Sequence, residues 1–146
     1  MTKMDKLQEI KKELYRYRNG IISESLKKLY GPDIVVFGLL IPQIKEIAAK
    51  YSKDIELGFQ LWNEKNIRES RLLSMLIIPE EMLDKEKASN MIMEVRNNEE
   101  AELLPFFLLR HLPYATELYK ELMGKDLSNP YSSYCLDMLK KNLSQS

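Results

Sequence analysis

Apolar residues recur along most of the chain at steps of three and four, with charged residues between them. Residues 6–17 show this spacing first, at Leu7, Ile10, Leu14 and Tyr17. It places an apolar stripe on one face of an α-helix. Residues 21–30 predict a second helix that ends at Gly31-Pro32, because glycine adopts positive φ readily and proline cannot continue a helix.

The run Ile34–Ile41 interrupts this pattern, since it is apolar and β-branched and contains Gly38. We expect a buried loop or a single extended segment here, because the chain offers no other strand to pair with it.

Three pairs of short helices follow. The predicted pairs cover 42–51 with 54–62, 66–77 with 84–96, and 98–112 with 113–123. The start signals are Pro42 and Pro113 in first turns and the capping residues Ser52, Asp54, Asn66 and Asp84. A last helix begins at Asn129-Pro130 and carries a stripe from Tyr131 to Leu143, with no partner after it.

The helix expected over 98–112 begins with Asn97-Asn98 and three glutamates, Glu99, Glu100 and Glu102. Negative charge at a helix N-terminus complements the macrodipole, which explains these glutamates better than paired acid–base catalysis does. We expect Pro105 in or near the first turn, with at most a mild kink before the helix ends at Leu112.

The return helices start near Asp54, Asp84 and Pro113, a period of roughly 30 residues. The pattern predicts an all-α fold, an α-solenoid of stacked antiparallel helix pairs that forms a single domain over residues 1–146. Such a HEAT-like arc has one concave face for binding, although its period is below the roughly 40–47 residues of the standard HEAT repeat. An irregular helical bundle is the competing architecture.

Charge and composition narrow the function. Lys plus Arg number 22 and Asp plus Glu number 22, so the chain as a whole has no field that attracts nucleic acid or anionic lipid. A neutral total can still conceal a basic surface. The start of the chain lacks a secretory pattern and no apolar run is long enough to span a bilayer, so we expect a cytoplasmic protein.

Cofactor chemistry has no signal in the sequence. Cys135 is the single cysteine, which we expect to be a buried small hydrophobe, and His111 is the single histidine. Neither has partners at ligand or triad spacing, and no phosphate loop or CxxC occurs, so we expect no metal and no cofactor.

Several motifs resemble the AlkD-type alkylpurine DNA glycosylases, a family of HEAT-like repeat proteins. The first is Phe37-Gly38-Leu39-Leu40-Ile41-Pro42-Gln43-Ile44-Lys45-Glu46-Ile47-Ala48, and the others are Leu61-Trp62, Ile67-Arg68-Glu69-Ser70-Arg71-Leu72-Leu73-Ser74 and Arg110-His111-Leu112-Pro113-Tyr114-Ala115. The resemblance runs from about Gly31 to the end of the chain. It implies a helical arc that holds duplex DNA and excises cationic alkylated purines without a metal or organic cofactor.

The residues that perform excision in this family are not matched. The resemblance implies a Trp and an Asp one turn apart near the third repeat and an Arg near the fourth. The best register places Asn97, Ala101 and Tyr134 there. Glu102 lies one step from the Asp position and is the weak catalytic candidate.

Four residues are candidates for contact with nucleic acid: Lys45, Arg68, Arg71 and Tyr134. Arg68 and Arg71 lie three apart on one predicted helix face, where they could reach phosphate oxygens. The alternative for Arg71, with Glu69, is a structural tie between helices, and for Arg68 a solvated surface charge. We expect Trp62 to be core packing.

Three functions remain open. The leading hypothesis is a short relative of the glycosylases that binds DNA or protein and lacks excision. The alternatives are an active glycosylase that uses Glu102, and a protein-interaction scaffold with no role in nucleic-acid binding.

Overall fold

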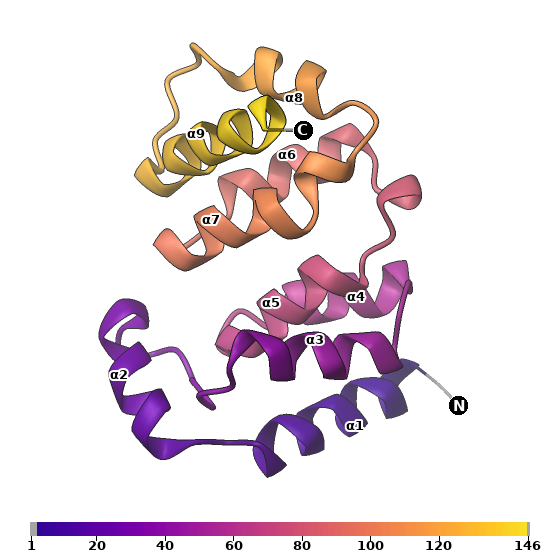
Figure 1. The fold of residues 1–146 in the computed structure, drawn as a ribbon, viewed down its shortest axis with the longest axis vertical. Helices are drawn as coiled ribbons and strands as arrows, with labels where there is room; N and C mark the ends of the chain where they lie inside the picture. The colour runs from indigo at the N-terminus through magenta and orange to yellow at the C-terminus, as the bar shows by residue number, and fades with distance from the viewer. Residues whose placement is uncertain (1–2, 146) are drawn as a thin grey trace. The chain divides into compact units, whose positions relative to one another are not determined.

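The computed structural model describes residues 3–145 of the chain, and it is helical throughout. Within these residues lie nine α-helices and two short 3₁₀ helices, with one isolated bridge and no strand, so the all-α prediction is confirmed (Figure 1). The chain divides into two compact units, residues 1–79 and 80–146. Each unit is described by itself.

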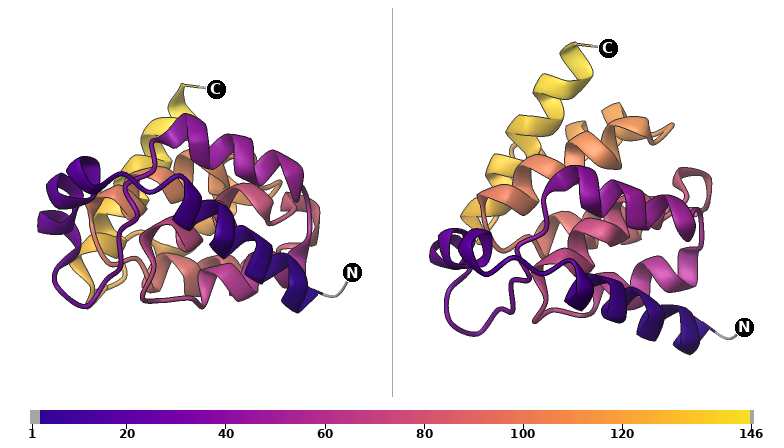
Figure 2. Two further views of the ribbon diagram at one scale, coloured as in Figure 1. Left: turned by 90° about the horizontal axis from the view of Figure 1, so that it is seen from below. Right: turned by 60° about the horizontal axis from the view of Figure 1, so that its bottom comes forward.

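The N-terminal unit holds five helices. They are α1 (Lys3–Arg16), α2 (Gly20–Tyr30), α3 (Ile41–Lys50), α4 (Ile55–Trp62) and α5 (Arg68–Ile77). α5 packs against both α3 and α4, and α1 packs against α4. Figure 2 shows α2 standing to one side of these four helices.

Side-chain caps and one close approach explain the local geometry of this unit. The Asn19 carboxamide accepts from the first amides of α2, and the Asp54 carboxylate accepts from Leu57 N in α4, as the sequence predicts for Asp54. Gly58 lets α4 approach the end of α5, because a Cβ there would lie 2.4 Å from Cγ1 of Ile78.

The segment between α2 and α3 is not helical, as predicted, and it finds an unexpected partner. Val35 forms an isolated parallel bridge with Ile67, just before α5. The backbone oxygen of Asn66 accepts from Val35 N at 2.6 Å, and the N-cap position of α5 is Ile67, which has no side-chain capping bond. The prediction that Asn66 caps this helix is therefore wrong, because backbone pairing with a distant loop fixes its start instead.

The C-terminal unit is arranged around α9. Its elements are a 3₁₀ turn (Glu80–Met82), α6 (Lys85–Met93), α7 (Asn98–Phe107), a second 3₁₀ turn (Leu109–His111), α8 (Ala115–Leu122) and α9 (Pro130–Ser144). α6, α7 and α8 all pack against α9. The last helix, predicted to have no partner after it, has its partners among the helices that precede it.

Helix α7 is shorter than predicted. It ends at Phe107, and Pro105 lies near its C-terminal end, not in its first turn. Proline has no N–H to donate to the carbonyl of Ala101, so the helix loses a bond and gives way two residues later to the 3₁₀ turn. The expectation of one helix to Leu112 is wrong for this reason.

The second predicted helix pair is divided between the units. α5 packs against α3 and α4, whereas α6 packs against α9. The apolar stripes of two helices predict that both form, but they do not predict which other helices each of them packs against.

Asn129 joins the end of α6 to the start of α9. Its Nδ2 donates to the carbonyl oxygens of Met93 and Val95 at 3.1 and 2.7 Å, and its Oδ1 accepts from Tyr131 N at 3.0 Å. The hydroxyl of Ser132 donates to the Ile92 carbonyl at 2.7 Å. Carbonyls that an α-helix leaves unpaired at its C-terminus are satisfied by the next helix.

Candidate functional site

Residues of two of the motifs, 37–48 and 67–74, meet around the carboxylate of Glu69 at the start of α5. Its side chain is completely buried and accepts from the amides of Phe37, Gly38 and Leu39 at 3.1, 3.0 and 3.4 Å. Three amides and a buried carboxylate form charge-assisted hydrogen bonds, which are stronger than neutral ones. Glu69 therefore fixes the loop before α3 against α5.

Arg68 completes this arrangement. Its Nη1 lies 2.7 Å from Oε2 of Glu69 and donates to the Leu39 carbonyl at 3.0 Å, and the residue is 2% exposed. A guanidinium held in this way is a structural counter-charge for the carboxylate. The prediction that Arg68 reaches a phosphate at the surface, or is a solvated charge, is corrected by its burial.

Arg71 is also interior. It is 1% exposed, its Nε donates to the carbonyl of Trp62 at 3.1 Å, and its Cζ lies 4.1 Å from the centroid of a Trp62 ring. The structural alternative given for Arg71, a tie between adjacent helices, is what the structure contains. Phosphate contact by Arg71 is not supported, because the guanidinium is used between α4 and α5.

The backbone conformation and the close packing at position 38 require a glycine in this motif. Its φ is +86°, and a Cβ there would lie 2.4 Å from Asn19 O and 2.7 Å from Ser23 N. Both neighbours are backbone atoms at the start of α2 and cannot yield easily. The motif loop is thus held on one side by α2 and on the other by α5.

Lys45, unlike the two arginines, lies at the surface. It is exposed on α3, the opposite side of which is buried through Ile44 and Ile47.

The positions expected to hold excision residues have structural roles in the C-terminal unit. Asn97 caps α7 through the amide of Glu100 at 3.0 Å, and Ala101 is fully buried. Tyr134 donates to Oε1 of Glu102 at 2.6 Å. That hydrogen bond, loss of hydration and the charge of Glu102 raise the pKa of Tyr134.

The structure thus brings together two predicted residues, Tyr134 and Glu102, in a surface pair. Glu100 is buried and accepts from the backbone N–H and the Nε of Arg96, each at 2.9 Å. The acidic residues lie in the first turn of α7, as predicted, and Glu100 in addition forms an ion pair with Arg96 that the sequence did not predict.

The remaining singled-out residues occupy ordinary positions. Trp62 is 1% exposed and belongs to the core, as predicted. Cys135 is buried as predicted, and burial raises the pKa of its thiol to about 12. His111 is exposed in a 3₁₀ turn.

The described residues contain neither a membrane-spanning helix nor a cluster of metal ligands. In residues 3–145 no helix has the length and apolar character needed to cross a membrane. Within the same part of the chain, no group of three or more His, Cys, Asp or Glu side chains is placed to hold a metal ion.

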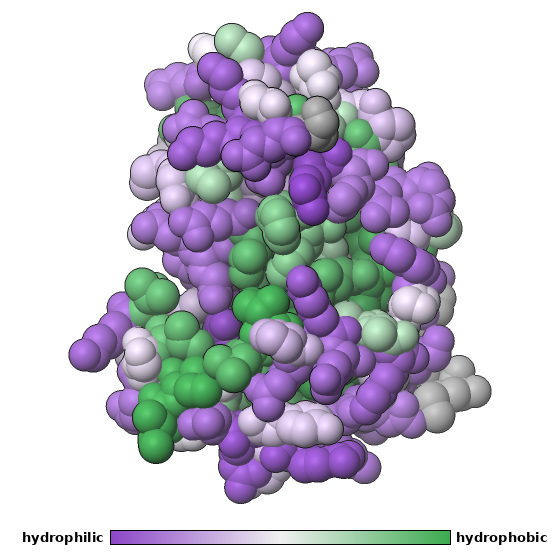
Figure 3. All heavy atoms as spheres, viewed as in Figure 1, coloured by the Kyte–Doolittle hydropathy of each residue, from purple (hydrophilic) through white to green (hydrophobic). Residues whose placement is uncertain are grey.

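Charge and apolar surface are unevenly distributed. Residues 1–79 contain 14 Lys and Arg against 10 Asp and Glu, and residues 80–146 contain 8 against 12. Figure 3 shows apolar side chains gathered over α2 and the loop after it, where Ile21, Leu29, Val35 and Leu40 are exposed.

Sequence reasoning missed one cluster beside this surface. Tyr15, Arg16, Tyr17 and Arg18 alternate at the end of α1, and all four are exposed. The alternation of aromatic and basic residues just before a helix stop was the available signal, hidden because Tyr17 also fits the apolar stripe.

Comparison with known proteins gives no relative: no family model, no curated protein and no solved structure matches this chain.

Proposed function

We propose that this chain is a DNA-binding module related in build to the AlkD-type glycosylases and without base excision. One observation carries the proposal: the resembling motifs before residue 79 supply internal contacts of the N-terminal unit, whereas the three excision positions are occupied by a cap, a buried alanine and a surface tyrosine. In this proposal the chain keeps the packing residues of the motifs and lacks the residues that excise a base.

The charge distribution favours DNA over protein as the partner. The neutral total divides into an N-terminal unit with four excess positive charges and a C-terminal unit with four excess negative ones. The potential of the N-terminal half attracts phosphate even though the whole chain is neutral. In this proposal the helices stack as a HEAT-like arc, and Lys45 on α3 is one of its phosphate contacts.

Absence of excision has a chemical reason. Departure of a cationic purine needs a carboxylate aimed at the developing charge and a water-excluding aromatic wall. Glu102 is exposed and accepts a hydrogen bond from Tyr134. A solvated carboxylate with a tyrosine partner stabilises a neighbouring cation much less than a buried one does.

Binding is tested with a fluorescein-labelled duplex at two salt concentrations. We expect affinity to fall steeply with salt, because each displaced phosphate counterion contributes to the slope. Lys45→Gln should reduce both the affinity and the slope, whereas the matched control Lys125→Gln, which removes one exposed charge from the C-terminal unit, should change neither. Salt-independent binding, or no binding, contradicts the proposal and favours a protein-interaction scaffold.

Catalysis is tested separately. Incubation with duplex that contains 7-methylguanine should release no base above the buffer control. If base is released, the proposal that the chain lacks excision is wrong. Glu102→Gln then tests the carboxylate: loss of release shows that Glu102 is needed for excision, and retained release shows that it is not.

A further inference from the structure

A cavity of about 540 Å³ lies in the N-terminal unit, where three segments meet. Its walls come from the end of α1, the first turn of α2 and the loop before α3: Arg16, Arg18, Gly20, Ser23, Val35 and Phe37. Its size falls within the range of about 300–1,000 Å³ typical of small-ligand sites. None of the lining residues is acidic.

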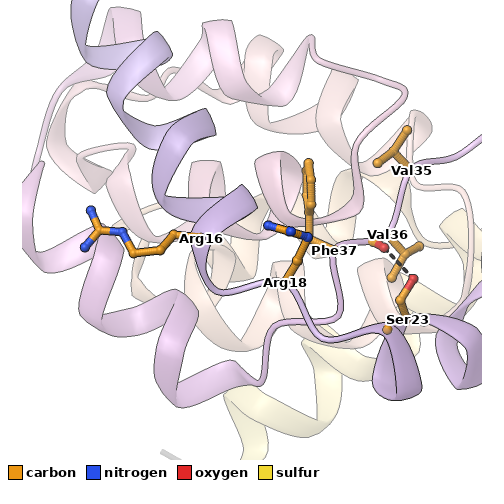
Figure 4. Close-up of a pocket in the computed structure, with 7 residues that line it drawn as sticks. Arg16, Arg18, Ser23, Val35, Val36 and Phe37 are labelled. Atoms are coloured by element: carbon orange, nitrogen blue, oxygen red, sulfur yellow. Dashed lines mark hydrogen bonds between the residues drawn. The ribbon is translucent and has the colours of Figure 1, made fainter.

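One side of this cavity is cationic. Arg16 and Arg18 are exposed, and neither forms an ion pair with a carboxylate among the described residues. In Figure 4 the side chain of Arg18 is drawn beside Phe37, and Arg16 extends in the other direction from the end of α1. Two guanidinium groups without carboxylates favour a ligand with more than one anionic oxygen, which they can bind in bidentate fashion.

The other side is apolar and aromatic. Val35 is 44% exposed and Phe37 is half-buried, so both present apolar surface to a ligand. Tyr15, 58% exposed, stacks on the lining residue Arg18, whose Cζ is 3.8 Å from the ring centroid. Aromatic rings and arginines in alternation form the stacking platforms of proteins that bind single-stranded nucleic acid.

The floor of the cavity is rigid before any ligand arrives. Phe37 donates its amide to Glu69 and accepts from Asn19 N at 2.8 Å, and the Ser23 hydroxyl donates to the Val36 carbonyl at 2.6 Å (Figure 4). Preformed walls reduce the entropy lost on binding.

We propose that this cavity binds an unpaired nucleotide of a single-stranded nucleic acid, with its base against Phe37 and Val35 and its phosphates on Arg18 and Arg16. The proposal rests on the proposed function for the class of ligand and adds the site and the preference for an unpaired strand. A base inside a duplex has no free face to stack on a side chain, so a cavity of this kind selects an unpaired base. An acidic peptide would satisfy the arginines but leave the aromatic wall without a stacking partner.

The test measures fluorescence anisotropy of the full chain with labelled dT12, with a 12-base-pair duplex and with a dodecamer of glutamate. We expect dT12 to bind more tightly than the duplex. Arg18→Gln and Phe37→Leu should each weaken dT12 binding by about fivefold or more, as loss of one stacking or phosphate contact does.

Arg110→Gln is the matched control. Arg110 lies in the C-terminal unit, its Cζ is 4.3 Å from the Phe106 ring centroid and its Nε donates to the Phe106 carbonyl at 2.8 Å. Arg18 has the same kind of stack and donates to the Tyr15 carbonyl at 2.7 Å. Each variant therefore removes one charge and one stack, and the control should change dT12 binding by less than about twofold.

The outcomes separate the two proposals. Equal effects of Arg18→Gln and Arg110→Gln overturn the site. Duplex binding with no binding of dT12 overturns the site and leaves the proposed function standing, whereas binding of neither overturns both. Arg18-dependent binding of the glutamate dodecamer in place of dT12 assigns the cavity to an acidic peptide and also overturns this inference.

Discussion

Replacement of Glu69 by Gln should strongly destabilise the N-terminal unit. The carboxylate accepts three amides of the loop before α3 and faces the buried guanidinium of Arg68. Gln can keep one oxygen toward Arg68, but its NH₂ group then faces the amide of Phe37, and Arg68 loses its counter-charge. A broken buried ion pair costs about 3–5 kcal/mol.

Urea unfolding followed by tryptophan fluorescence measures this loss. Trp62 is the single tryptophan, is 1% exposed and lies in α4, so its emission reports on the N-terminal unit alone. We expect Glu69→Gln to lower the free energy of unfolding by about 3–5 kcal/mol. The matched control Glu102→Gln removes an exposed carboxylate from the other unit and should leave the Trp62 transition unchanged.

A double variant tests the cause. If the uncompensated Arg68 charge is the main cost, Arg68→Met combined with Glu69→Gln should be less unstable than the sum of the two single variants by about 1–3 kcal/mol. A Glu69→Gln transition within about 0.5 kcal/mol of wild type would refute the reasoning, because an ordinary surface substitution has that effect.

Three further predictions concern other parts of the chain. In the same urea assay, Gly38→Ala should lower the free energy of unfolding by at least about 2 kcal/mol more than Gly31→Ala does. Both glycines have positive φ, but only a Cβ at Gly38 meets backbone atoms, so equal losses would contradict the steric explanation. Cys135 should react with a disulfide reagent at pH 8 about a thousandfold more slowly in the folded chain than in urea, because the thiol is buried, and rates within tenfold would contradict this. Burial and the nearby carboxylates Glu13 and Glu9 raise the pKa of Tyr51 from 10.0 to about 12. The unfolded chain therefore releases this proton at lower pH, and the free energy of unfolding should fall as pH rises from about 10 to 12. Tyr51→Phe should show a shallower fall, and identical pH profiles would refute the assignment.

Local signals in the sequence predicted local structure well. Asp54 and Asp84 cap their helices, and Gly31 ends α2 at positive φ, because each of these effects depends on residues within one turn. The end of α7 was missed although its start at Asn98 was predicted, since Pro105 was expected in or near the first turn, whereas it lies near the C-terminal end of the helix.

The candidate site could not be predicted fully from the sequence, because it depends on contacts between residues far apart in the chain. Arg68 and Arg71 are charged, and charged residues are rarely fully buried, so a sequence alone favours an exposed position for them. Their partners are the Leu39 carbonyl, about 30 positions away, and the Trp62 carbonyl on the preceding helix. Only folding brings these groups together, so the sequence predicted Arg68 at the surface, where the structure buries it, and offered the internal role of Arg71 only as an alternative to phosphate contact.

The position of Asn129 limits how the C-terminal unit can be shortened. A single carboxamide both closes the carbonyl end of α6 and opens the amide end of α9, so neither terminus is complete without the other. A chain that stopped at Leu127 would leave the oxygens of Met93 and Val95 to water and strip α6, α7 and α8 of the helix that they share. The packing surface of three helices thus depends on the fifteen residues of α9, so the stability of this unit should be lost when that segment is removed.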